Sequence, residues 1–200
     1  MTNLLLLRHG QIKANKQGRW HGSTDSPLTW RGRRQAKRAA RFVRGTEPPV
    51  RAVYSSPLTR CRDTAHVVAE SLDLEVTVHP ELREYAIGDW EGMPFRELAT
   101  RYQFVELATG DHDFAPPGGE TLREVAERMV AALREIHQRH ASDERVLVVS
   151  HGAAMAVALG TLIDLDPGSW TNYHFANCSL TELVLEPAPY VNFFNLTHHL

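Results

Sequence analysis

Two short, uninterrupted apolar runs constrain the fold of this 200-residue chain more than any other feature. Leu4–Leu7 and Val146–Val149 consist of apolar residues only, and each run ends at a polar triplet. Runs of this kind are typical of strands that are covered on both faces, as in a parallel sheet. We therefore expect both segments to lie inside one sheet.

The chain between and after these runs alternates strand and helix patterns. Further strands are expected at Ala52–Ser55, Leu74–Val78, Leu180–Leu185 and Tyr190–Leu196. Apolar residues at helical spacing predict helices over Thr29–Arg44, from Pro57 to Leu72, over Thr121–Ile136 and over Ala153–Ile163. We expect Ser56 to cap the second of these helices, and Thr121 with Glu124 has the form of a capping box.

Strands that alternate with helices imply right-handed crossovers, which place helices on both faces of the sheet. The fold class predicted from this pattern is α/β, a three-layer α/β/α sandwich with a mainly parallel central sheet. The length fits a single domain over residues 1–200. Glycine and proline interrupt residues 85–117, so we expect an irregular, lid-like excursion there, with a short helix near Phe95–Leu107.

Composition and charge exclude several classes of function. A formal net charge of −2 argues against a nucleic-acid binder, which usually carries a basic excess. Cys61 and Cys178 are too few and too far apart for a disulfide framework or a zinc site. The apolar run before Arg8 is too short for a signal peptide or a membrane span, so a cytoplasmic protein is the expectation.

The polar triplets that end the two apolar runs are Arg8-His9-Gly10 and Ser150-His151-Gly152. Functional residues of open α/β sheets gather beyond the carboxyl ends of the strands, so both imidazoles are expected in one crevice. Arg60 lies in the first turn of the helix that follows Ser56, where the helix dipole also favours an anion. Two guanidinium groups, two imidazoles and glycines that admit close backbone approach predict a site for phosphate.

A metal site is the competing interpretation of the two histidines. Neither His9 nor His151 has a second histidine or a carboxylate cluster at ligand spacing. His198 and His199 stand isolated near the end of the sequence. We therefore predict no metal ligands.

Several motifs in sequence order resemble the histidine phosphatase superfamily, the phosphoglycerate-mutase-like proteins, from about residue 3 onward. They are Leu7-Arg8-His9-Gly10-Gln11, Asn15, His21-Gly22, Asp25-Ser-Pro-Leu-Thr29, Gly32, Ser55-Ser-Pro-Leu-Thr-Arg60, Leu82-Arg-Glu84, Gly88-Asp-Trp-Glu-Gly92, Pro117-Gly-Gly-Glu120 and Ser150-His151-Gly152. The resemblance implies a phosphoglycerate-mutase-like fold and phosphatase chemistry on small phosphorylated substrates.

The resemblance also implies a role for each matching residue. His9 is the implied nucleophile, which carries the phosphoryl group as phosphohistidine, and Glu84 is the implied general acid and then general base. Three cationic or imidazole side chains would bind the equatorial oxygens: Arg8, Arg60 and His151. The remaining implied substrate-binding residues are Asn15, His21, Gly22 and Gly152. Phosphoryl transfer needs positioning and charge neutralisation above all, and fixed cationic donors supply both, so no cofactor is expected.

Other activities on the same fold stay open at this stage. A cofactor-dependent phosphoglycerate mutase is one, but the segment between Glu84 and His151 is short and lacks paired arginines for a second phosphate, so hydrolysis is favoured. A protein phosphatase and a non-catalytic phosphate-binding module are the others. Gln11 and Ala14 depart from residues common in the family.

Three further features receive structural interpretations. The arginine-rich helix from Trp30 to Arg44 is interpreted as a solvated face that steers anions. At least half of the aromatic residues Trp90, Phe95, Tyr102 and Phe104 are expected to be packing residues. An exposed strand near the C-terminus permits a homodimer.

Overall fold

The computed structural model describes residues 3–141 and 143–200, and six strands of this part form one sheet, in the order β3-β2-β4-β1-β5-β6. The strands are β1 (Asn3–Arg8), β2 (Val50–Ser55), β3 (Val76–Val78), β4 (Arg145–Ser150), β5 (Leu180–Val184) and β6 (Tyr190–Leu196). β1 pairs in parallel with β4, β4 with β2, and β2 with β3, whereas β5 and β6 run antiparallel to their neighbours. The predicted mainly parallel sheet, with both apolar runs as neighbouring strands, is confirmed.

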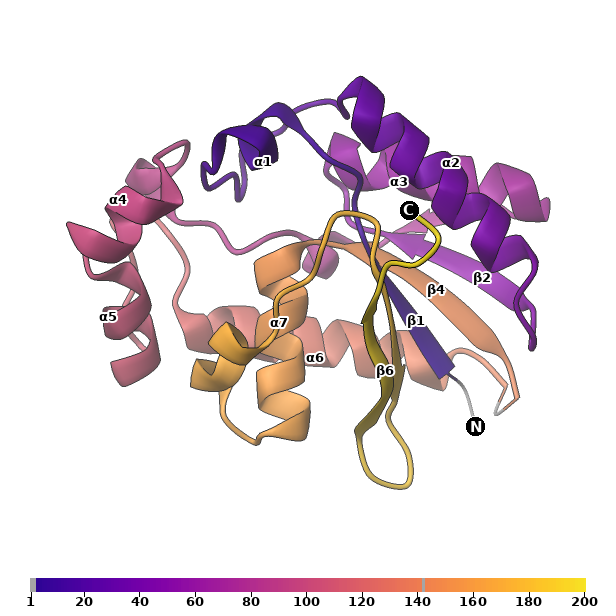
Figure 1. The fold of residues 1–200 in the computed structure, drawn as a ribbon. Coiled ribbons are helices and arrows are strands. Elements are labelled where there is room, and N and C mark those ends of the chain that lie inside the picture. The colour runs from indigo at the N-terminus through magenta and orange to yellow at the C-terminus, as the bar shows by residue number, and fades with distance from the viewer. Residues whose placement is uncertain (1–2, 142) are drawn as a thin grey trace.

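Helices cover both faces of this sheet (Figure 1). They are α1 (Lys13–Gln17), α2 (Trp30–Arg44), α3 (Thr59–Leu72), α4 (Phe95–Thr100), α5 (Phe104–Gly110), α6 (Leu122–Gln138) and α7 (Gly152–Ile163), with short 3₁₀ turns η1 (Pro80–Leu82), η2 (Gly88–Trp90) and η3 (Pro167–Asn172). Leu5 and Leu7 of β1 pack with the apolar faces of α2 and α3, and Leu4 and Leu6 pack with α6 and α7. Alternation of side chains along a strand therefore produces two cores, and the predicted α/β/α sandwich is confirmed.

The helix boundaries follow the sequence patterns with two exceptions. Thr121 and Glu124 form the predicted capping box at the start of α6. Ser56 was predicted to cap α3, and this prediction is wrong: α3 begins at Thr59, because the Ser56 hydroxyl lies 2.7 Å from Nε2 of His151 instead. The helix expected near Phe95–Leu107 is divided into α4 and α5, since Gln103 adopts a left-handed conformation with φ of 50°.

A close backbone contact fixes the start of α2 against the end of β1. A Cβ atom on Gly10 would lie 2.6 Å from the carbonyl oxygen of Gly32, and a Cβ on Gly32 would lie 2.2 Å from that of Gln11. Only glycine fits at either position without displacing backbone. The first turn of α2 is therefore held directly beside the residues that follow His9.

None of the helices in the described part of the chain combines the length and the apolar character that a membrane crossing requires.

Candidate active site

A cavity of about 1040 Å³ lies beyond the carboxyl ends of β1 and β4. Six of the nine predicted site residues line it: Arg8, His9, Asn15, His21, Glu84 and Gly152. The other three, Gly22, Arg60 and His151, are buried and do not line it. The sheet register explains the convergence, because Arg8 pairs with Ser150 and the two strands end at the same level. The rings of His9 and His151 consequently lie 5.2 Å apart, edge to face.

The His9 imidazole is held in one tautomer. Its Nδ1 lies 2.8 Å from the carbonyl oxygen of Gly10, which can only accept, so Nδ1 carries the proton. Burial, with Arg60 and Arg8 nearby, holds the pKa of His9 well below its usual value. The ring is therefore neutral at pH 7, and the lone pair of Nε2 is free to act as a nucleophile.

His151 is held in the opposite tautomer. The Nε–H of Arg60 donates to Nδ1 of His151 at 3.1 Å, so Nδ1 carries no proton. The proton of the neutral ring then lies on Nε2, which donates to the Ser56 hydroxyl at 2.7 Å. Burial and the charge of Arg60 keep the pKa of His151 well below its usual value.

Arg60 is completely buried and engages all three of its guanidinium nitrogens. Besides His151, it donates to the carbonyl oxygens of Thr24 at 2.8 Å, His21 at 3.0 Å and Gly22 at 2.7 Å. These acceptors belong to the loop of residues 21–24, which carries His21 to the cavity wall. The guanidinium group thus joins that loop to His151 and places a fixed positive charge behind His9.

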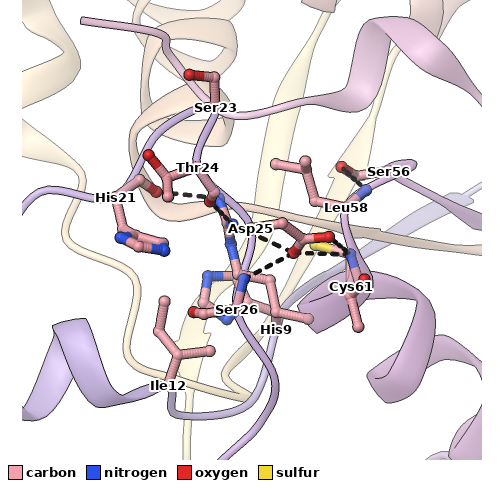
Figure 2. A network of polar contacts seen from close by, with 12 residues as sticks. His9, Ile12, His21, Ser23, Thr24, Asp25, Ser26, Ser56, Leu58 and Cys61 are labelled. Atoms are coloured by element: carbon pink, nitrogen blue, oxygen red, sulfur yellow. Dashed lines mark hydrogen bonds and ion pairs between the residues drawn. The ribbon is translucent and has the colours of Figure 1, made fainter. Parts of the chain in front are cut away.

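Asp25 connects the same loop to the start of α3, as Figure 2 shows. Its carboxylate accepts the backbone N–H of Thr59 at 2.9 Å and of Ser26 at 2.9 Å. Burial raises the pKa of Asp25, but the hydrogen bonds from Thr59 and Ser26 outweigh it and leave this pKa below its usual value. A residue distant in sequence therefore caps α3 where Ser56 was expected to do so.

Glu84 reaches the cavity from the segment after η1 and meets the first turn of α7. Its Oε1 accepts the backbone N–H of Ala154 at 2.7 Å and of Tyr85 at 2.9 Å, and Oε2 lies 3.3 Å from the N–H of Ala153. The weakly bonded Oε2 is the oxygen able to exchange a proton with a bound ligand.

Arg8 lies along the first turn of α7. Its Nη1 donates to the carbonyl oxygen of Phe175, and its buried Nε makes no hydrogen bond with any residue that the structure describes. A Cβ on Gly152 would lie 3.2 Å from this Nε, so glycine gives the guanidinium group room to lie against the helix terminus. Arg8 is thus fixed in place and retains donors for an anion.

Asn15 and His21 add neutral polar groups to the cavity wall. The side-chain oxygen of Asn15 accepts the N–H of Ile12 and an N–H of Asn177, at 3.0 and 3.1 Å, which directs its amide nitrogen to the cavity. The Nε2 atom of His21 is buried and forms no hydrogen bond within residues 3–141 and 143–200. Asn15 therefore has donor capacity that a bound anion can use, and Nε2 of His21 is a buried polar atom without a protein partner in the described residues.

The sequence interpretation missed several cavity residues and one residue behind the wall. The residue behind the wall is Glu91, which holds the 21–24 loop in place. It belongs to the Gly88–Gly92 motif, which the sequence shows without indicating this role. Its carboxylate accepts from Gly22 N, Ser23 N, Thr24 Oγ1 and Ile87 N at 2.8, 3.0, 3.1 and 3.2 Å.

The aromatic residues divide as expected. Phe95 lines the cavity, and Phe104 is fully buried in the core. The rings of Trp90 and Tyr102 contact each other in a tilted arrangement, with centroids 4.9 Å apart, and neither residue lines the cavity. Trp20 and Trp170 line it as well, which no sequence pattern indicates.

The charged side chains that line the cavity are mostly positive. Arg8, Arg19, Arg31 and Arg38 line it, whereas Glu84 is the single acidic side chain among the described lining residues. Nowhere in that part of the chain do three or more His, Cys, Asp or Glu side chains gather as a metal site would require. A neutral histidine beneath several fixed cations suits a compact, highly charged anion.

The sequence is similar to known phosphatases along nearly its whole length. Residues 4–192 match the histidine phosphatase superfamily (branch 1). A relative from Bacillus subtilis, the uncharacterized phosphatase PhoE, is 34% identical over 167 residues, which cover 84% of this chain and 80% of the relative. The probable phosphoglycerate mutase GpmB of Yersinia enterocolitica is 32% identical over 96% of this chain and 88% of its own.

The fold is similar to a solved structure as well. Phosphoserine phosphatase from Entamoeba histolytica, in complex with 3-phosphoglyceric acid, superposes with a TM-score of 0.88 at 29% identity, over 100% of this chain and 99% of that one. The predicted family and its α/β fold are confirmed, and the predicted enzyme class, a phosphoric monoester hydrolase, agrees with relatives named as phosphatases. This chain belongs to the histidine phosphatase superfamily.

Proposed function

We propose that this protein hydrolyses phosphate monoesters of small metabolites through a phosphohistidine intermediate on His9. One observation carries the proposal: the Gly10 carbonyl fixes the His9 proton on Nδ1 and leaves Nε2 as a lone pair in a cationic cavity. An imidazole held in this way needs no separate base to become a nucleophile.

The first step forms the Nε2–P bond and breaks the ester P–O bond in line. Protonated Glu84 gives its proton from Oε2 to the departing alkoxide, and the free alcohol leaves. In the second step Glu84 takes a proton from water, the water oxygen attacks phosphorus, and the Nε2–P bond breaks. Inorganic phosphate is released, and His9 and Glu84 return to their starting states.

The remaining predicted residues stabilise charge on the transferred phosphoryl group. Arg8 and Asn15 donate from the cavity wall, beside His21 and the backbone N–H of Gly152. The N–H of Gly22 is already bonded to Glu91, so Gly22 shapes the 21–24 loop. Arg60 and His151 act from behind His9, where their contacts hold the ring and the 21–24 loop.

Replacement of His9 tests the proposal directly. His9→Ala should abolish phosphate release from a generic aryl phosphate, and wild-type protein quenched during turnover should carry a phosphoryl group at His9 by mass spectrometry. Retained turnover in His9→Ala would exclude the nucleophile assignment. Phosphate release without any bisphosphorylated cofactor separates the hydrolase from a mutase of the same fold.

We also propose one domain over residues 1–200, a cytoplasmic location and a homodimer. Both cysteines are free and buried, which is consistent with a reducing compartment. β6 is the last strand of the sheet and exposes Tyr190 and Phe194. A single unfolding transition and a mass measurement by light scattering test the first and last of these proposals.

A further inference from the structure

One face of α2 forms a wall of the cavity. Arg31, Gln35 and Arg38 line it, and their spacing of four and three residues places them on the same side of the helix. The other basic residues of α2 are absent from the lining: Arg33, Arg34, Lys37, Arg41 and Arg44. The sequence interpretation of this helix as a solvated face therefore describes only part of it.

Arg31 lies close to the phosphoryl-transfer centre. It precedes Gly32, whose backbone touches Gly10 and Gln11 directly after His9. Gln35 is joined to the same segment, since its side-chain oxygen accepts the N–H of Gln11 at 3.0 Å. The cationic wall is consequently part of the same rigid framework as the nucleophile.

The guanidinium groups of the two arginines in this wall are not paired with any side chain that the structure describes. Across the residues that the structure describes, neither Arg31 nor Arg38 forms an ion pair or a hydrogen bond with another side chain, and no acidic side chain other than Glu84 lines the cavity. Arg34 differs, because its guanidinium group lies over the ring of Trp30 at 4.6 Å. Arg19 differs as well, since Nη1 donates to the carbonyl oxygen of Gly92 at 2.7 Å.

Beyond Arg8 and Arg19, the rest of the described cavity lining contains no further arginine or lysine. Its other large side chains are mostly apolar or aromatic: Trp20, Phe95, Val105, Trp170, Tyr173 and Phe175. The cavity also has far more room than one phosphate group fills, at about 1040 Å³. Beyond the phosphoryl-transfer centre it thus offers one cationic wall and one apolar wall.

We infer that Arg31 and Arg38 form a subsite for a second anionic group on the substrate. The preferred substrates are then phosphate monoesters whose carbon skeleton carries a carboxylate or another phosphate, placed so that it reaches α2 while the ester phosphate lies at His9. The inference rests on the proposed phosphatase activity and specifies its substrate class.

Matched substrates test the inference. The ω-hydroxyalkyl phosphates provide neutral comparators for ω-carboxyalkyl phosphates and for alkanediol bisphosphates of the same chain length, and their leaving alkoxides are similar. At the best chain length, wild-type kcat/KM should favour an anionic substrate over its hydroxyl comparator by roughly 10-fold to 100-fold, as expected for charge-assisted hydrogen bonds. The carboxylate and bisphosphate series distinguish the two sources of charge.

Variants of α2 test whether Arg31 and Arg38 cause the preference for the anionic substrate over its hydroxyl comparator. Arg31→Ala and Arg38→Ala should each reduce it and the double variant should abolish it, while turnover of the hydroxyl comparators stays unchanged. Arg41→Ala, an exposed arginine of the same helix outside the cavity, should retain wild-type selectivity. The conservative double variant Arg31→Lys with Arg38→Lys should retain part of the preference.

Two results would overturn the inference. Equal losses on charged and neutral substrates would show general steering of anions, and an unchanged preference in the double variant would place the anionic group elsewhere. Absence of phosphate release from every substrate, a generic aryl phosphate included, would instead contradict the proposed function.

Discussion

The Nε–H of Arg60 donates to Nδ1 of His151 across 3.1 Å, and neither side chain lines the cavity. An arginine cannot accept a hydrogen bond, so this contact determines which nitrogen of the imidazole carries the proton. Because the rings of His151 and His9 lie 5.2 Å apart, the pair supports the proposed nucleophile from behind.

Arg60→Lys should lower kcat/KM for an aryl phosphate by roughly 100-fold. Lysine keeps the charge but cannot reach His151 and three loop carbonyls at once. Steady-state kinetics measure the loss, and Arg62→Lys, an exposed neighbour on α3, serves as the control. Activity equal to that of the control would show that charge alone matters at this position.

Glu84→Gln should affect substrates according to their leaving groups. Alkyl phosphates need a proton on the departing oxygen and should lose roughly 10²-fold to 10⁴-fold in kcat/KM, whereas activated aryl phosphates should lose much less. A series of phosphates with leaving groups of graded acidity measures the difference, with the exposed Asp89→Asn as control. A uniform loss across the series would contradict the general-acid role.

The unfolding free energy should fall as the pH is lowered from about 7 toward 5. Burial and the nearby arginines keep the pKa values of His9 and His151 well below the value of about 6.5 that applies to the unfolded chain. Between those values the unfolded state binds more protons, at a slope of up to about 1.4 kcal/mol per pH unit for each histidine.

Denaturant titrations over this pH range, in a buffer free of phosphate, measure the slope. His9→Asn should lower this slope by up to about 1.4 kcal/mol per pH unit, the contribution of one proton. His66→Asn, at an exposed position on α3, is the comparison variant. A slope that His9→Asn leaves as steep as in the wild type would mean that His9 takes up its proton in the folded state.

Glu91→Gln should raise KM and destabilise the fold. The carboxylate accepts four hydrogen bonds, three of them from the 21–24 loop, and an amide nitrogen would face donors there. The expected cost is about 1–3 kcal/mol, visible in thermal unfolding, with a larger effect on KM than on kcat. Glu106→Gln, on the exposed face of α5, is the control. Wild-type KM in Glu91→Gln would show that the loop holds its shape without this carboxylate.

The sequence predicted those parts of the fold and site that depend on local pattern. The continuous apolar runs of β1 and β4 identify central parallel strands, and the strand-end rule then brings His9 and His151 together. The capping box at Thr121 involves residues within one turn, and Thr121 and Glu124 bond to each other as their local pattern predicts.

The missed features depend on contacts between distant segments. Ser56-Pro57 has the pattern of a helix start, but His151 takes the Ser56 hydroxyl and Asp25 caps Thr59 from another loop. Helical periodicity shows that Arg31 and Arg38 share a face of α2. It does not show that this face meets a cavity, because that depends on how the helix is docked on the sheet.

The contact between Gly10 and Gly32 bears on how this enzyme selects substrates by size. Backbone touches backbone there, so no side chain can rotate away to change the spacing between β1 and α2. The distance from His9, the proposed nucleophile, to Arg31 and Arg38 is thereby set by the backbone. With the proposed subsite on α2, this fixed spacing would select substrates by the distance between their two anionic groups, and a methyl group at position 10 or 32 would change it.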